Sequence, residues 1–204
     1  IETQLGQTLD ALRRGMTHLP DLTSDTAALL LSQRIDLLAR AQDVSHLAPE
    51  QAGQRIRIHG DYHLGQILRT KADYVILDFE GEPARSLSER RTKQSPLKDV
   101  AGMLRSFSYA AFVGLDQFAQ RRPEAAKSGE PWATLWQNAV ATAFLHAYKL
   151  TIAANPHLIP KAEQAQVLLN SYLLEKSLYE LLYELNNRPA WVRIPLAGIL
   201  ALSK

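Results

Sequence analysis

Leucines at helical spacing mark the beginning of the chain. Four apolar residues follow one another at intervals of four, three and four positions: Leu5, Leu9, Leu12 and Met16. This spacing brings all four side chains to one side of an α-helix. We therefore predict an amphipathic helix over residues 3–17, and we expect Pro20 to end it because proline lacks the amide hydrogen that a continuing helix needs.

A second helical pattern follows directly. Thr23, Ser24 and Asp25 carry side-chain oxygens of the kind that cap the start of a helix. Three apolar residues then recur on one face: Leu31, Ile35 and Leu38. These signals predict one long helix from the cap to about residue 46, followed by a polar connector over residues 49–54.

The pattern then changes to one of short strands. Residues 55–59 alternate charged and apolar side chains, which is typical of a strand. Residues 66–68 and 74–79 predict a β-hairpin with its turn at 70–73. Residues 81–96 show no periodicity and predict a loop. We interpret its basic residues as a solvated surface, with attraction of phosphate as the alternative: Arg85, Arg90, Arg91 and Lys93.

Helical patterns return in the second half. Ser95 as a cap and Pro96 in the first turn start a helix with this apolar face: Leu97, Val100, Leu104, Phe107 and Ala111. After a loop over 121–129, Pro131 is expected to open a helix with a stripe that we place in the core: Leu135, Trp136, Ala139, Val140, Ala143, Phe144 and Ala147. Pro160 opens a last helix over about 160–186. The fold class is therefore mainly α (α+β), helical with one short β-hairpin.

Composition narrows the class of protein. The 204 residues are 46% hydrophobic and 22% charged, as in an ordinary globular protein. A net charge of +2 argues against nucleic acid as a partner. The chain has no cysteine, which agrees with a reducing cytoplasm, and no apolar run is long enough to predict a membrane span. We expect a cytoplasmic protein with neither nucleic acid nor membrane as a partner.

Oxygen-bearing side chains gather around the predicted hairpin. Asp61 and Gln66 lie five positions apart in a glycine-containing loop, and Asp78 comes at the end of the second strand. Transfer of a phosphoryl group from ATP requires a positioned hydroxyl and Mg²⁺, which takes oxygen ligands. Asp78 and Gln66 are the candidate ligands of Mg²⁺ and its bound ATP. Asp61 is the candidate acceptor of the hydroxyl proton, and His63 a candidate donor to the phosphate.

The same loop has a second interpretation. His59, Asp61 and His63 alternate, so on a regular strand they would share one side, as the ligands of a metal hydrolase do. Gly60 and Gly65 favour an irregular loop instead, and we interpret His59 as a packed residue that braces it. Zinc bound by the chain and lost on replacing His59 would favour the hydrolase.

Four sequence blocks resemble a known family. The first, His59-Gly60-Asp61-Tyr62-His63-Leu64-Gly65-Gln66, resembles the catalytic loop His-Gly-Asp-x-His-x-x-Asn of the aminoglycoside-phosphotransferase-like branch of the protein-kinase-like fold, with Gln in place of the final Asn. Together with residues 77–83, 98–107 and 183–192, it is similar to the maltokinase family, where Gln at that place is expected.

The resemblance implies a C-terminal kinase lobe. It would comprise a helical entry (1–53), the catalytic loop with its metal-binding strand and activation-like loop (54–96), and a helical subdomain (97–204). No Gly-x-Gly occurs, so we expect the N-terminal lobe that covers ATP to be absent from this chain and the chain alone to turn over negligibly. In the family, an Asp at the place of Asp99 ties the catalytic loop in position; a favourable charge at a helix start is the alternative role.

The resemblance also implies a reaction. This is ATP-dependent phosphorylation of maltose to maltose 1-phosphate in glycogen metabolism, with Mg²⁺, and with a trehalose synthase, fused or associated, as a partner. Six residues near the end of the chain are candidate sugar contacts: Glu175, Lys176, Tyr179, Tyr183, Arg188 and Trp191. The alternative for each is a place in an amphipathic helix with salt bridges. Kinases of aminoglycosides or choline, and a non-catalytic interaction lobe, remain as other functions.

Overall fold

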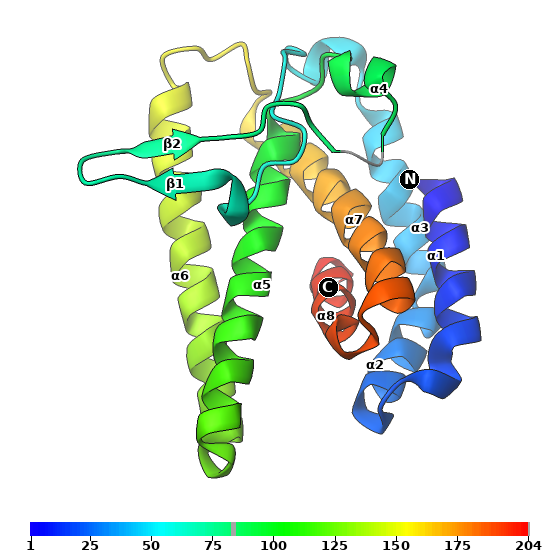
Figure 1. The fold of residues 1–204 in the computed structure, drawn as a ribbon. Helices are drawn as coiled ribbons and strands as arrows, with labels where there is room; N and C mark the ends of the chain where they lie inside the picture. The colour runs from blue at the N-terminus through cyan, green and yellow to red at the C-terminus, as the bar shows by residue number, and fades with distance from the viewer. Residues whose placement is uncertain (83–84, 204) are drawn as a thin grey trace. The chain divides into compact units, whose positions relative to one another are not determined.

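The computed structural model describes residues 1–82 and 85–203, and its contacts divide the chain into two compact units (Figure 1). Unit 1 joins the two ends of the chain, Ile1–Ala52 and Pro160–Lys204, and unit 2 is Gly53–Ile159. Pro83, the last residue of the second sequence block, and Lys204 lie outside the described residues. The mainly helical class with one short hairpin is confirmed. None of the described helices is long and apolar enough to cross a bilayer.

Unit 1 is built around a core of leucines. Its α-helices are α1 (Glu2–Gly15), α2 (Asp21–Ser32), α3 (Arg34–Asp43), α7 (Ala162–Asn187) and α8 (Arg193–Leu202). Short 3₁₀ turns join them: η1 (Met16–His18), η2 (Val44–His46), η3 (Pro49–Gln51) and η6 (Pro189–Trp191). The predicted first helix is confirmed, because Leu5, Leu9 and Leu12 are fully buried in one core with leucines of α2, α3, α7 and α8. The predicted last helix corresponds to α7.

The prediction of a single long second helix is wrong. The chain forms α2 and α3 instead, and α2 begins at Asp21 with Pro20 at its N-cap. The helix breaks at Gln33, whose N–H bonds to Leu30 O at 3.1 Å in a tight turn. This break shifts the phase of the apolar face, so Ile35 is 80% exposed. Ser24 does not cap the helix, since its hydroxyl donates to the carbonyls of η1 and the segment after it.

Unit 2 carries the hairpin, which is confirmed. Strands β1 (Ile67–Arg69) and β2 (Tyr74–Ile76) pair antiparallel, with Ile67 opposite Ile76, and the Thr70 N–H bonds to Asp73 O across the turn. The 3₁₀ turn η4 (Leu64–Gln66) precedes β1. The helices of unit 2 are α4 (Leu87–Arg91), α5 (Leu97–Arg121) and α6 (Ala126–Ile152), with η5 (Pro123–Ala125) between the last two.

Two predicted boundaries in unit 2 need correction. Residues 55–59 do not form a strand; Ile56 only makes an isolated bridge with Gln94. The predicted loop 81–96 contains α4, which begins with a capping box in which the Ser86 hydroxyl accepts from Glu89 N–H and the Glu89 carboxylate accepts from Ser86 N–H. Arg90 of α4 donates to Glu80 O, whereas the neighbouring Arg91 is exposed.

The predicted start of α5 is close to the observed one. The helix begins at Leu97, and its N-cap is Pro96 rather than Ser95, although the Ser95 hydroxyl accepts from Leu97 N–H at 3.3 Å. Four of the five predicted face residues are buried: Leu97, Val100, Phe107 and Ala111. Helix α5 then runs along α6, connected through η5 (Figure 1). Pro123 opens η5, and η5 leads directly into α6, which begins at Ala126. Pro131 therefore lies inside the helix that it was expected to start.

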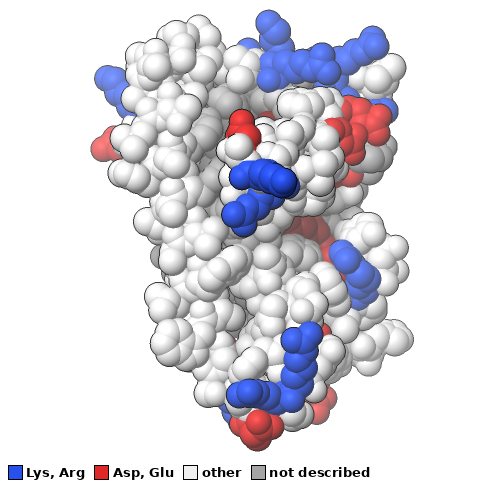
Figure 2. Space-filling model, turned by 60° about the vertical axis from the view of Figure 1, so that its left-hand side comes forward, with Lys and Arg blue, Asp and Glu red and all other residues white. Residues whose placement is uncertain are grey.

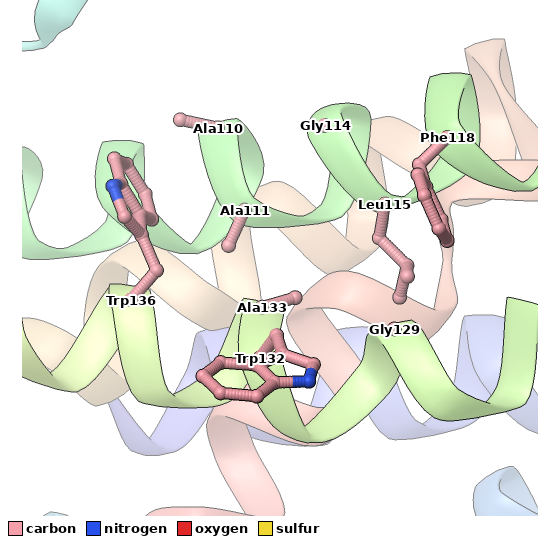
Figure 3. Close-up of a pocket in the computed structure, with 9 residues that line it drawn as sticks. All are labelled: Ala110, Ala111, Gly114, Leu115, Phe118, Gly129, Trp132, Ala133 and Trp136. Atoms are coloured by element: carbon pink, nitrogen blue, oxygen red, sulfur yellow. The ribbon is translucent and has the colours of Figure 1, made fainter. Parts of the chain in front are cut away.

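The aromatic stripe of α6 is not in the core. All residues of α6 are described, and no residue of this helix is buried. Trp132 is 72% and Trp136 45% exposed. They line an open cavity of about 510 Å³ whose floor is made by small residues of α5 and α6 (Figure 3). Residues 131–148 contain no charged side chain, and Figure 2 shows an extended uncharged surface on the side that carries α6 in Figure 1.

Candidate active site

The loop between His59 and Gln66 depends on close backbone packing. Gly60 adopts φ +86°, a conformation that side chains rarely allow. A Cβ at Gly60 would also lie 3.3 Å from Cα of Gly81, which follows the hairpin. The loop and the segment after Asp78 therefore lie close against each other, and a side chain at Gly60 would be strained by its backbone conformation and crowded by Gly81.

Asp99 of α5 holds the start of this loop. Its Oδ2 accepts from His59 N–H at 2.7 Å, and its Oδ1 accepts from Gly60 N–H at 2.9 Å. Burial raises the pKa of Asp99 above that of a free carboxyl group, while these two hydrogen bonds act in the opposite direction. The structure thus has the backbone contact that the resemblance implied for Asp99.

His59 is buried among aromatic rings and hydrogen-bonded on both nitrogens. Its ring lies 5.0 Å from that of Phe79 and 5.5 Å from that of Tyr62. Nε2 is 2.6 Å from Leu77 O, and Nδ1 faces Asp61 N–H at 3.4 Å. One tautomer satisfies both contacts: Nε2 donates and Nδ1 accepts. These contacts agree with the interpretation of His59 as a residue that braces the loop.

The hydrolase interpretation requires a group of metal ligands. Across the part of the chain that the structure describes, no three His, Asp or Glu side chains are grouped to hold a metal ion. Mg²⁺ with ATP is a different case, because it needs only one or two protein oxygens beside phosphates and water.

Asp61 and His63 lie side by side in the loop. His63 Nε2 is 3.7 Å from Asp61 Oδ2, and His63 Nδ1 accepts from Gly65 N–H at 3.0 Å. The side chain of Asp61 is 19% exposed and that of His63 41%. A carboxylate that solvent can reach, with an imidazole beside it, can accept the proton of a bound hydroxyl. The catalytic roles of both residues stay predictions.

The hairpin brings Gln66 and Asp78 together. Leu77 N–H bonds to Gln66 O, and Gln66 Nε2 donates to Asp78 Oδ2 at 3.0 Å. Asp78 has φ +61° and is the one non-glycine residue in the left-handed region among those described. Such a backbone costs about 1–2 kcal/mol and is concentrated at functional sites.

This pair fits the ligand chemistry of Mg²⁺. Asp78 supplies a carboxylate, and a half-turn of the Gln66 amide would present Oε1 in place of Nε2. Gln66 and Asp78 are therefore the residues that would hold the ion. Their role as ligands remains a prediction.

The candidate sugar contacts lie in unit 1. Arg188, just after α7, makes a two-pronged ion pair with the buried Glu184, with N–O distances of 2.6 and 2.8 Å. Its guanidinium lies over the rings of Trp191, at 4.4 Å, and Tyr183, at 5.3 Å. Three of the six predicted residues thus form one cluster around Arg188. Glu184, the carboxylate of this cluster, was not among the predicted contacts, although its i, i+4 spacing to Arg188 signals the pair.

The other three predicted residues lie earlier on α7. Lys176 Nζ is 5.2 Å from the centre of the Tyr179 ring, and the backbone carbonyl of Glu175 accepts from Gln4 of α1. All three are partly buried. A role in sugar binding stays a prediction for all six residues.

The chain is similar in sequence to two glucosamine kinases. No family model matches the chain. It is 31% identical over 183 residues to a glucosamine kinase of Mycolicibacterium smegmatis, covering 88% of this chain and 42% of the relative. It is 30% identical over 145 residues to a glucosamine kinase of Streptacidiphilus jiangxiensis, covering 69% of this chain and 30% of the relative. The chain therefore spans less than half the length of these relatives.

Solved structures of glucosamine kinase have the same fold as this chain over part of their length. Glucosamine kinase in complex with glucosamine, ADP and inorganic phosphate superposes with a TM-score of 0.74 at 24% identity, over 97% of this chain and 43% of that one. Crystal form A of glucosamine kinase gives 0.75 at 24% identity, over 97% and 42%. The narrower resemblance to maltokinase receives no support from these relatives. The chain has the fold of part of a glucosamine kinase.

Proposed function

We propose that this chain is part of a sugar kinase that transfers a phosphoryl group from ATP to a sugar hydroxyl. The observation that carries the proposal is the arrangement of unit 2. There the hairpin holds Gln66 against Asp78, and Asp99 fixes the loop that contains Asp61. The similarity to glucosamine kinases supports the same reaction class.

Each residue has a distinct task in this reaction. Mg²⁺, when bound, would neutralise phosphate charge, and Asp78 and Gln66 would hold it. Asp61 would orient the acceptor hydroxyl and take its proton. His63, beside Asp61, would donate to the transferring phosphate. Since these residues supply positioning and charge rather than a covalent intermediate, small displacements of the loop would slow the reaction.

Glucosamine is the first acceptor to test, because it names the reaction of both relatives. An ammonium group on the sugar would require a carboxylate, and Glu175 is the one carboxylate among the six candidate contacts. Glu184 is already paired with Arg188. The rings of Tyr183 and Trp191 beside Arg188 suit the faces of any sugar.

Maltose is the second acceptor, favoured by the four sequence blocks that resemble maltokinase. The proposal of a trehalose synthase as a partner depends on maltose being the acceptor. If maltose is not phosphorylated, this partner is withdrawn as well.

The test is a kinase assay on the intact protein. ADP release is measured with glucosamine, maltose, choline and an aminoglycoside in turn, with and without Mg²⁺. We expect turnover with one sugar, and Asp61→Asn should reduce kcat by about 10²–10⁴-fold without loss of folding. Asp78→Ala should abolish Mg²⁺-dependent ATP binding, whereas Asp73→Asn, in the turn of the same hairpin, should leave it intact. Absence of turnover with every sugar would favour the non-catalytic lobe.

A further inference from the structure

One face of α5 contacts the backbone of the catalytic loop at three successive places. Asp99, Gly102 and Ser106 are three and four positions apart, so they share this face. Asp99 accepts from the N–H groups of His59 and Gly60, as described above. Gly102 and Ser106 have been given no role in the proposed reaction so far. Each contacts the loop next to a residue that has one, either Asp61 or His63.

Gly102 is a site of close approach. A Cβ placed there would lie 2.7 Å from the carbonyl oxygen of Tyr62, closer than such atoms approach in proteins. Any side chain at position 102 must therefore push Tyr62 away from α5. Tyr62 directly follows Asp61, so this displacement would move the candidate base.

Ser106 holds the loop one turn further along. Its hydroxyl oxygen accepts from Leu64 N–H at 3.0 Å. Leu64 directly follows His63 and is 40% exposed, so we expect its amide hydrogen to depend on this contact for protection from exchange with solvent. Ser108, on the same helix, behaves differently: its hydroxyl donates to Leu104 O within α5.

We propose that Gly102 and Ser106 are positioning residues, which hold Asp61 and His63 in place through the backbone of Tyr62 and Leu64. The effect on turnover rests on the proposed sugar kinase function, but the effect on the loop does not. Asp99 fixes the entry to the loop, and the two new residues fix the backbone directly after Asp61 and His63. Side chains that act in phosphoryl transfer need this restraint, because misplacement by about 1 Å can cost on the order of 100-fold in rate.

The experiment compares matched variants of the intact protein. Ser106→Ala is paired with Ser108→Ala, and Gly102→Ala with Gly114→Ala, since an added Cβ at Gly114 meets nothing within 4 Å. Hydrogen exchange of the backbone amides in residues 59–66 measures the loop directly. Values of kcat and KM with the sugar that the wild type accepts measure the consequence. Ser106→Thr, which keeps the hydroxyl, is the conservative rescue.

We expect Ser106→Ala to speed exchange at Leu64 by roughly two- to tenfold, the effect of losing one neutral hydrogen bond. Gly102→Ala should speed exchange around Tyr62. Both variants should lower kcat by about 10- to 100-fold with little change in KM for either substrate. Ser108→Ala and Gly114→Ala should resemble the wild type, and Ser106→Thr should restore protection at Leu64.

Exchange at Leu64 that is unchanged in Ser106→Ala, or that rises equally in Ser108→Ala, would overturn the proposal. So would changed exchange with an unaltered kcat. If Gly102→Ala does not fold, the serine series decides alone. An intact protein without sugar kinase activity would reject the proposed function, and the exchange data would then still decide whether α5 restrains the loop.

Discussion

The two halves of helix α5 use small residues for opposite purposes. In the first half, Gly102 lets a loop backbone approach within contact distance. In the second half, Ala110 and Gly114 form the floor of an open cavity beside exposed tryptophans, and nothing lies within 4 Å of a Cβ built on Gly114 (Figure 3). A small residue in a helix therefore has no fixed meaning; what it faces decides its role.

The polar residues of α5 follow the same division. Asp99 and Ser106 point their oxygens at backbone amides of the loop, whereas Asp116 in the second half accepts from Gln120 on its own helix. The first half of α5 thus restrains the backbone of the loop. The cavity half presents an apolar surface instead. Substitutions in the two halves should therefore differ in kind as well as in size.

The largest difference in stability between the two halves should appear when a phenylalanine of each half is replaced by alanine. Phe107, in the first half, is 5% exposed and meets the Phe144 ring edge-on at 5.7 Å. Phe107→Ala should lower the free energy of unfolding by about 3–5 kcal/mol, because it leaves a cavity in a packed region. Phe118→Ala, in the second half, removes a side chain that is 38% exposed and should cost clearly less. Urea unfolding of both variants checks this, and equal losses would contradict the division.

Asp99→Asn should have the next largest effect. Asparagine keeps the shape but offers only one acceptor oxygen, so the N–H of either His59 or Gly60 loses its partner. A buried unpaired N–H costs about 1–3 kcal/mol. Unfolding in urea should show a loss of this size, and amide exchange at residues 59–60 should rise. Asp116→Asn is the control on the same helix, and a loss as large in that variant would argue against a special role for Asp99.

A smaller effect should appear on changing the pH. Burial raises the pKa of Asp99 above the value of 3.8 for a free side chain. Between the unfolded and the folded pKa, the native state binds more protons than the unfolded state, so the contribution of Asp99 to stability is full below the lower value and is lost as the pH rises through the higher one. The free energy of unfolding of the wild type, relative to Asp99→Asn, should therefore fall as the pH rises above 3.8. A relative stability that rises with pH would show that the two backbone hydrogen bonds outweigh burial.

Local signals in the sequence were sufficient where the neighbouring residues decide the structure. The spacing of Leu5, Leu9 and Leu12 predicts α1, and the turn at 70–73 predicts the hairpin. Ser95 and Pro96 predict the start of α5, which begins at Leu97. Local signals were also available but unused for α4, since Ser86 and Glu89 have the spacing of a capping box.

The site could be predicted only in part. The motif around Asp61 predicts a loop, and the structure brings Gln66 against Asp78 as one site for an ion would require. The contacts of Gly102 and Ser106 depend on a helix that lies some 40 residues later in the chain than Tyr62 and Leu64. No periodicity contains such information, because a close approach between distant segments is a property of the packed structure.

The prediction that the aromatic stripe of α6 lies in the core was wrong for a related reason. Apolar residues at helical spacing predict a face that is covered, but they do not specify that anything within the same chain covers it. Trp132 and its neighbours lie open between α5 and α6 (Figure 3).

The smallest effect should therefore come from Trp132→Ala. Because 72% of this side chain is exposed, its removal should change the free energy of unfolding by no more than about 0.5 kcal/mol. A tryptophan in a packed core would cost about 3–5 kcal/mol on the same substitution. Urea unfolding distinguishes the two values, with Trp136→Ala, 45% exposed, as the companion that should lie between them. A loss of 3 kcal/mol or more for Trp132→Ala would mean that the cavity is covered in solution, and the contrast between the two halves of α5 would then have to be withdrawn.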